Sequence, residues 1–141
     1  MILKIAVLSG DGIGPEVTEQ SIKVLKSLGK KFNHEIELES GLVGAVAIDK
    51  YNDPYPDETH QVCLNSDAIL FGAIGDPKYD NDPKAKVRPE QGLLKMRKKL
   101  GLYANLRHTK VFKYLLDMSP IKEERISDVM TYNHVMLIVV R

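Results

Sequence analysis

The start of the chain constrains the fold most strongly, because an apolar run leads directly into a glycine turn and a proline. Residues 2–8 are apolar at all positions but one, which is typical of a buried strand. Glycine occupies alternate positions of residues 10–14, and Pro15 suits the first turn of a helix, where its missing N–H costs nothing. We expect that helix to end near Gly29. A strand, a tight turn and a helix in this order indicate an α/β fold with a largely parallel sheet.

The same alternation continues along the chain. Residues 40–55 and 75–88 are rich in Gly, Asp, Asn and Pro, and we expect both to be mostly loop. Apolar and β-branched runs predict the other strands, and helical spacing predicts the other helices. We expect strands over 35–39, 67–74, 102–107 and 135–140, and helices over 56–65, 89–100 and 112–118.

Composition excludes several classes of function. The chain has 20 basic and 19 acidic residues, so its net charge of +1 gives no general field for nucleic acid. Its one cysteine, Cys63, has no partner for an internal disulfide, which fits a reducing compartment. No apolar stretch approaches the roughly 20 residues of a membrane span. We therefore expect a soluble cytoplasmic protein with no nucleic-acid or membrane partner.

The glycine turn does not match the dinucleotide fingerprint of the Rossmann fold. The pattern G-x-G-x-x-G requires a third glycine where this chain has Pro15. Free N–H groups at the start of the following helix favour an anionic or polar ligand. A tight strand-to-helix turn that binds no ligand explains the spacing equally well.

One face of the helix expected over residues 89–100 combines charge with apolar surface. At about 100° per residue, Glu90, Leu93, Leu94 and Arg97 fall within one arc of about 100°. A guanidinium fork beside two leucines suits a molecule that is anionic at one end and apolar at the other. The alternative is an amphipathic helix whose leucines enter the core beneath the aliphatic part of Arg97.

Two further arginines, Arg107 and Arg141, lie on the strands expected next along the chain. Three arginines from three elements suit a dicarboxylate, although a surface ion pair is the commoner fate of each. The histidines have no metal-ligand spacing, and the aspartates of residues 76–82 lack the glycine and glutamate of a calcium loop. We expect no metal ligands in this chain.

Two segments together resemble a known family. Gly10-Asp11-Gly12-Ile13-Gly14-Pro15-Glu16-Val17 is similar to the opening of the β-decarboxylating dehydrogenases. Arg88-Pro89-Glu90-Gln91-Gly92-Leu93-Leu94, followed by Arg97 and by residues 102–107, resembles the isopropylmalate branch, because isocitrate enzymes carry serine and asparagine in place of the leucines. The likeness covers about residues 2–125.

The resemblance implies an isopropylmalate dehydrogenase-like two-domain α/β fold that is not a Rossmann fold, with only its N-terminal part present. Residues 1–101 would begin the cofactor-side domain, and residues 102–141 would begin the second, substrate and dimerisation domain. The chain ends directly after an expected buried strand, so we expect it to be cut short. His108 replaces a usual proline, and residues 126–134 form a longer link than the family has.

The resemblance also implies a reaction and a set of site residues. The reaction is the NAD-dependent oxidative decarboxylation of 3-isopropylmalate to 2-oxoisocaproate in leucine biosynthesis, assisted by Mg or Mn in a homodimer. Arg97, Arg107 and Arg141 would bind the malate carboxylates, Leu93 and Leu94 the isopropyl group, and Ile13 and Glu90 the cofactor. The family's catalytic lysine and tyrosine and its metal ligands would lie beyond Arg141, so we expect no catalytic residue here. The alternatives are a related malate-type enzyme acting on isocitrate, tartrate or homoisocitrate, and a non-catalytic fragment.

Overall fold

Strand β1 (Ile2–Gly10) lies at the centre of a three-stranded parallel sheet with the order β2-β1-β3. The computed structural model describes residues 1–80, 86–104 and 118. Strand β2 (Glu35–Ser40) pairs with one edge of β1, and β3 (Ala68–Ala73) pairs with the other. Ile5 shows the register, because it stands opposite Leu38 on β2 and Ala68 on β3. The predicted α/β class with a parallel sheet is therefore confirmed for the described residues.

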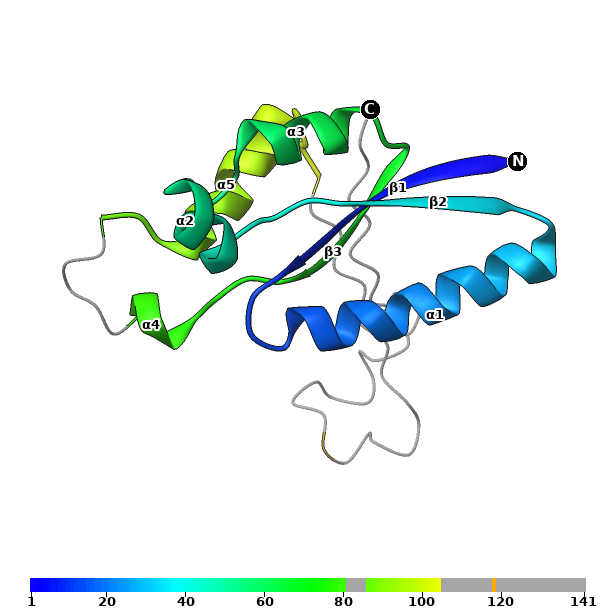
Figure 1. Cartoon of the computed structure of the whole chain (residues 1–141), viewed down its shortest axis with the longest axis horizontal. Coiled ribbons are helices and arrows are strands. Elements are labelled where there is room, and N and C mark those ends of the chain that lie inside the picture. The colour runs from blue at the N-terminus through cyan, green and yellow to red at the C-terminus, as the bar shows by residue number, and fades with distance from the viewer. Residues whose placement is uncertain (81–85, 105–117, 119–141) are drawn as a thin grey trace. The chain divides into compact units, whose positions relative to one another are not determined.

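Helices cover both faces of this sheet. Figure 1 shows α1 (Gly14–Phe32) on one side and α3 (Asp57–Leu64) and α5 (Pro89–Lys99) on the other. Two shorter helices, α2 (Ala45–Tyr51) and α4 (Pro77–Asp80), lie near the carboxyl ends of the strands. The predicted helices over 56–65 and 89–100 and the predicted strands over 35–39 and 67–74 are confirmed within two residues at each end.

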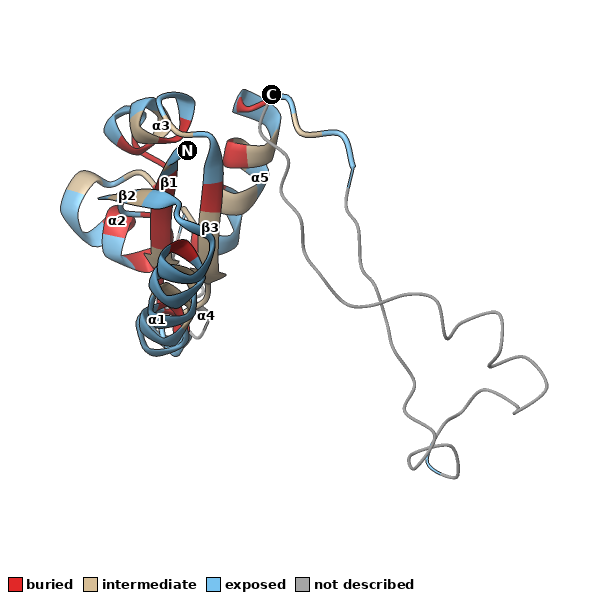
Figure 2. Ribbon diagram, turned by 90° about the vertical axis from the view of Figure 1, so that its right-hand side faces the viewer, coloured by how far each residue is buried: buried red, intermediate tan, exposed pale blue. Residues whose placement is uncertain are grey.

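The core lies between the sheet and the helices, where Figure 2 shows the buried residues on β1, β3 and the inner sides of α3 and α5. Alternate apolar side chains of β1 enter both layers, as expected of a strand covered on both faces. The largest fully buried side chains are those of Leu8, Val43, Tyr55, Cys63, Pro89 and Met96. Burial raises the pKa of the Cys63 thiol, which makes this cysteine a poor nucleophile.

Helix α1 continues beyond the predicted end at Gly29. Gly29 is buried inside the helix, where a Cβ would lie 3.0 Å from the Cδ1 atom of Ile36 on β2. The helix ends instead at Phe32, and the C-cap residue Asn33 adopts the left-handed conformation with φ of 56°. The prediction was wrong because this glycine permits close helix–strand packing and does not terminate the helix.

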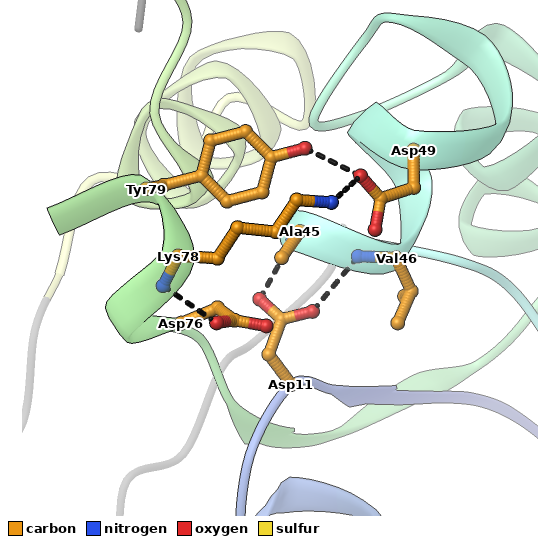
Figure 3. A network of polar contacts seen from close by, with 7 residues as sticks. All are labelled: Asp11, Ala45, Val46, Asp49, Asp76, Lys78 and Tyr79. Carbon is orange, nitrogen blue, oxygen red and sulfur yellow. Dashed lines mark hydrogen bonds and ion pairs between the residues drawn. The ribbon is translucent and has the colours of Figure 1, made fainter. Parts of the chain in front are cut away.

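The prediction that residues 40–55 are mostly loop holds only in part, because the segment contains helix α2, whose start is capped by a distant carboxylate. Asp11 Oδ2 accepts a hydrogen bond of 2.7 Å from the N–H of Ala45, and Oδ1 accepts one of 3.0 Å from Val46 (Figure 3). The residue before the helix, Gly44, has no side chain with which to cap it. Asp11 therefore satisfies the first N–H groups of α2 from a position 34 residues earlier.

Other predictions meet the structure only in part. The predicted loop over 75–88 contains the short helix α4. Residues 102–104 do not form a strand, and the rest of the strand predicted over 102–107 lies outside the described residues. The predicted helix over 112–118, Met118 apart, and the predicted strand over 135–140 lie outside them as well. No helix among the described residues is long and apolar enough to cross a membrane.

Substitution of Gly10 tests the packing of β1 against the end of β3. Gly10 has φ of +73°, and a Cβ there would overlap the carbonyl oxygen of Ala73. Gly101 has φ of +66° and no heavy atom within 4 Å of its Cβ position, so it is a matched control. We expect Gly101→Ala to cost about 1–2 kcal/mol and Gly10→Ala about 3 kcal/mol or more. Equal shifts in urea unfolding of the chain would contradict this packing.

Substitution of Asp11 tests the cap of α2. Asp11→Ala leaves several N–H groups without an acceptor, and we expect it to lower the free energy of unfolding by about 2–4 kcal/mol. Asp76, which accepts one exposed backbone hydrogen bond from Lys78 at 2.9 Å, provides the control. Asp76→Ala should cost less than about 1 kcal/mol. Guanidinium unfolding measures both, and a loss no greater for Asp11 than for Asp76 contradicts the proposed cap.

Candidate substrate and cofactor site

The carboxyl ends of β1 and β3 meet where the chain changes direction across the sheet. From β1 the chain crosses to β2 on one side, and from β2 it returns to β3 on the other. In open α/β sheets, ligands bind outside the carboxyl ends of the strands at such a switch point. The glycine turn follows β1 at this point, and the segment 74–80 follows β3. These two segments therefore define the candidate site.

The glycine turn is held by contacts within the chain. The N–H of Asp11 donates to the carbonyl oxygen of Ala73 at 2.7 Å, and the N–H of Gly14 donates to the carbonyl oxygen of Asp11 at 2.8 Å. The Asp11 side chain is only 3% exposed, and its Oδ2 also accepts a hydrogen bond of 3.3 Å from the N–H of Gly75. These contacts explain the tight turn without a ligand. Ligand binding by the N–H groups at the start of the following helix stays a prediction.

Ile13 is an exposed large apolar residue in the glycine turn. It is 58% exposed and stands directly before α1, with no side-chain cap on that helix. An exposed apolar side chain at the carboxyl end of the sheet leaves surface for a ligand to cover. Contact between Ile13 and a cofactor was predicted from the family resemblance, and it stays a prediction.

Gly75 brings the glycine turn close to the first turn of α5. A Cβ on Gly12 would lie 3.5 Å from the carbonyl oxygen of Gly75, and a Cβ on Gly75 would lie 3.6 Å from Oε1 of Glu90. The exposed Glu90 carboxylate therefore stands across Gly75 from the turn that carries Ile13. The two residues predicted for the cofactor thus lie on segments that both approach Gly75.

The segment between β3 and α5 is also tied to α2. Asp49 Oδ1 accepts hydrogen bonds of 2.7 Å from Nζ of Lys78 and 2.6 Å from the hydroxyl of Tyr79, both on α4 (Figure 3). The hydrogen bond from Lys78, followed by that from Tyr79, lowers the pKa of the Asp49 carboxyl. Sequence reasoning missed this contact, because residues 49 and 78 are far apart in the chain and neither has a distinctive local pattern.

Helix α5 buries one stripe and leaves the predicted binding face accessible. Pro89, Gly92 and Met96 are buried against the rest of the chain. Leu94 is 64% exposed, while Leu93 and Arg97 are half-buried. The alternative in which the leucines enter the core therefore does not hold for Leu94. The roles of these residues toward a substrate stay predictions.

The other predicted site residues lie outside the described part of the chain. Neither Arg107 nor Arg141 is among the described residues, so the structure does not relate them to α5. Among the residues that are described, no three His, Cys, Asp or Glu side chains form a cluster that suits a metal ion. The predicted site residues within the described part of the chain are thus Ile13, Glu90 and those on the face of α5 that carries Leu93, Leu94 and Arg97.

Comparison with known proteins gives a consistent answer. Residues 4–141 match the isocitrate/isopropylmalate dehydrogenase family. The chain is 58% identical over 124 residues to a 3-isopropylmalate dehydrogenase of Bacteroides fragilis, covering 88% of this chain and 35% of that protein. It is 56% identical over 126 residues to the enzyme of that name from Bacillus subtilis, covering 89% and 34%. The chain thus spans about a third of the length of these curated relatives.

Solved structures agree with the sequence matches. A β-decarboxylating dehydrogenase from Thermococcus kodakarensis is 34% identical with a TM-score of 0.61, covering 77% of this chain and 30% of that one. An isocitrate dehydrogenase from Methylococcus capsulatus is 26% identical with a TM-score of 0.59, covering 78% and 29%. The matched family extends over nearly the whole chain, and the chain belongs to the isocitrate/isopropylmalate dehydrogenase family.

Proposed function

We propose that the whole protein oxidises 3-isopropylmalate with NAD and decarboxylates the product, and that this chain supplies its alkyl-binding helix and part of its cofactor site. One observation carries the proposal. Helix α5 leaves Leu94 exposed on the face shared with Arg97, beside a glutamate that lies near the glycine turn. The names of the Bacteroides and Bacillus relatives support the same substrate.

The proposed substrate-binding part of the site is formed by side chains of α5. Arg97 offers a planar fork for a carboxylate, and Leu93 and Leu94 offer an apolar surface for a branched alkyl group. Covering an exposed leucine fully contributes about 1.5–3 kcal/mol to binding. Arg107 and Arg141 are proposed, from the family resemblance, to bind the carboxylates with Arg97.

The cofactor end rests on Ile13 and Glu90. An exposed carboxylate accepts hydrogen bonds from ribose hydroxyls, and Gly75 beside it has no side chain to obstruct a ligand. Ile13 offers apolar contact on the other side of Gly75. The residues present thus fit the nicotinamide ribose of NAD.

A divalent metal, Mg or Mn, would act as a Lewis acid toward the developing enolate. The described residues hold no cluster of acidic side chains for it, so we assign its ligands to the rest of the protein. The task left to this chain is to bind and orient the substrate, so that its hydroxyl-bearing carbon faces the acceptor of the hydride. The family resemblance assigns the proton-transfer groups to the remainder as well.

The organisation of the whole protein is proposed on the same basis. Residues 1–101 would begin the cofactor-side domain, and residues 102–141 would begin the second domain. The whole protein would act as a cytoplasmic homodimer in leucine biosynthesis. A related enzyme for isocitrate, tartrate or homoisocitrate is the main alternative, and the exposed leucine on α5 argues against its more polar substrates.

Substrate preference of the whole protein tests the proposal. With NAD and magnesium, we expect kcat/KM for 3-isopropylmalate to exceed that for isocitrate by about 100-fold or more. Leu94→Ser should reduce kcat/KM for 3-isopropylmalate by about tenfold. Leu64, a 53% exposed leucine on α3, is the control, and Leu64→Ser should leave the value unchanged. A preference for isocitrate, or equal effects of the two substitutions, contradicts the proposed substrate.

The isolated chain gives a second test. We expect residues 1–141 alone to form no NADH from 3-isopropylmalate, NAD and magnesium, because the proposed metal ligands and proton-transfer groups lie elsewhere. Absorbance at the NADH band, with the whole protein as positive control, measures this. Turnover by the purified chain would show that it holds catalytic groups which this assignment places outside it.

A further inference from the structure

Two contacts fasten α5 to the loop between α2 and α3. The first is a close approach of backbones: a Cβ on Gly92 would lie 2.5 Å from the carbonyl oxygen of Pro54. The second is an ion pair of 2.5 Å between Nζ of Lys95 and Oδ2 of Asp53, one turn further along α5. We call these two contacts the α5 clamp.

On its side of the clamp, Asp53 is also held by a contact within its own loop. Asp53 Oδ1 accepts a hydrogen bond of 3.0 Å from the N–H of Tyr55, whose side chain is fully buried. Partial burial raises the pKa of the Asp53 carboxyl, but the hydrogen bonds from Lys95 and Tyr55 outweigh it and lower that pKa. The carboxylate is therefore charged and oriented near neutral pH, and it meets Lys95 in a defined direction.

The Pro54 side of the clamp leads back to the glycine turn. The carbonyl oxygen of Pro54 accepts a hydrogen bond of 2.9 Å from the N–H of Gly44, the residue before α2. Helix α2 is in turn capped by the carboxylate of Asp11. A continuous set of contacts, two between backbones and one through the Asp11 carboxylate, thus relates the position of α5 to the turn that carries Ile13.

The α5 clamp bears on the orientation of α5 more than on its stability. Lys95 lies between Leu94 and Met96, and its side chain is about as exposed as that of Asp53, at 35% and 34%. A partly exposed ion pair of this kind contributes only about 0–1 kcal/mol to stability. Rotation or tilt of the helix, however, displaces Leu93, Leu94 and Arg97 together, and a displacement of about 1 Å in a positioning element costs up to about 100-fold in rate.

We propose that Lys95 and Gly92 are positioning residues, which act through Asp53 and Pro54 to set how far the leucines of α5 reach toward the alkyl group of the substrate. This inference rests on the proposed function. It assigns selectivity for a branched 2-hydroxy diacid to contacts on the side of α5 that is turned away from the substrate. Lys99 strengthens the same attachment one turn later, through an ion pair of 2.5 Å with Asp57.

The test compares two substrates of the whole protein. 3-Isopropylmalate needs both the leucines and Arg97, whereas malate has no alkyl group and needs only the carboxylate contacts. The ratio of kcat/KM for the two therefore reports the position of the leucines. We expect Lys95→Met to lower this ratio about tenfold, with little change in melting temperature. Lys95→Arg, which can still pair with Asp53, should restore the ratio to near that of the wild type.

A neighbouring lysine provides the control. Lys98 is exposed on the same helix, and Lys98→Met removes the same charge without touching the clamp. It should leave the ratio unchanged. Gly92→Ala keeps the ion pair but forces α5 away from Pro54, and it should lower the ratio at least as far as Lys95→Met does. A ratio for Lys95→Met equal to that for Lys98→Met, or no recovery in Lys95→Arg, overturns the proposal.

Hydrogen exchange separates this proposal from the proposed function. Amide exchange in residues 92–99 of the whole protein should be faster in Lys95→Met than in Lys98→Met, whatever the substrate is. If that difference appears but the wild type does not oxidise 3-isopropylmalate, the proposed function fails while the clamp stands. If exchange in the two variants is the same, the clamp itself is wrong.

Discussion

The carboxylate of Asp11 is the contact on which the arrangement at the carboxyl ends of the strands depends. It accepts hydrogen bonds from N–H groups at the start of α2 and from the N–H of Gly75 after β3. The backbone N–H of Asp11 donates to the carbonyl oxygen of Ala73. One buried side chain thus joins the ends of two strands to the start of a helix. A buried carboxylate is stable only when such hydrogen bonds replace its lost hydration, so the glycines around it serve to bring backbone N–H groups within reach.

The position of the Asp11 carboxylate limits where a ligand could bind near the glycine turn. The negative charge near the start of α2 belongs to the chain itself, so α2 is not a free site for an external anion. The surface left open consists of Ile13 and of the exposed carboxylate of Glu90 across Gly75. Helix α1, which the turn leads into, has no side-chain cap, so binding of an anionic or polar ligand at its first N–H groups stays a prediction.

The sequence predicts the parts of the fold whose causes are local. β1, β3 and α5 each show their own periodicity, and their bounds lie within two residues of expectation. Helix α2 is not predicted because the residue that caps it, Asp11, lies 34 residues earlier, just after β1. The contacts of Asp49 with Lys78 and Tyr79 are not predicted because the fold alone brings these residues together. The end of α1 is predicted wrongly for a related reason. Gly29 allows the helix to pack closely against Ile36, a residue of β2, and does not terminate the helix. The sequence predicts the shared face of Glu90, Leu93, Leu94 and Arg97 because helical spacing over two turns brings them together, whereas the clamp on the opposite face depends on where Asp53 lies in the fold.

The leucines of α5 are proposed to receive the alkyl group of a branched malate. Magnetisation transfer between the isopropyl methyl groups of bound 3-isopropylmalate and methyl-labelled leucines of the whole protein tests it most directly. We expect cross-peaks to Leu94, which is exposed, and to its neighbour Leu93. Cross-peaks only to leucines outside α5 would contradict it.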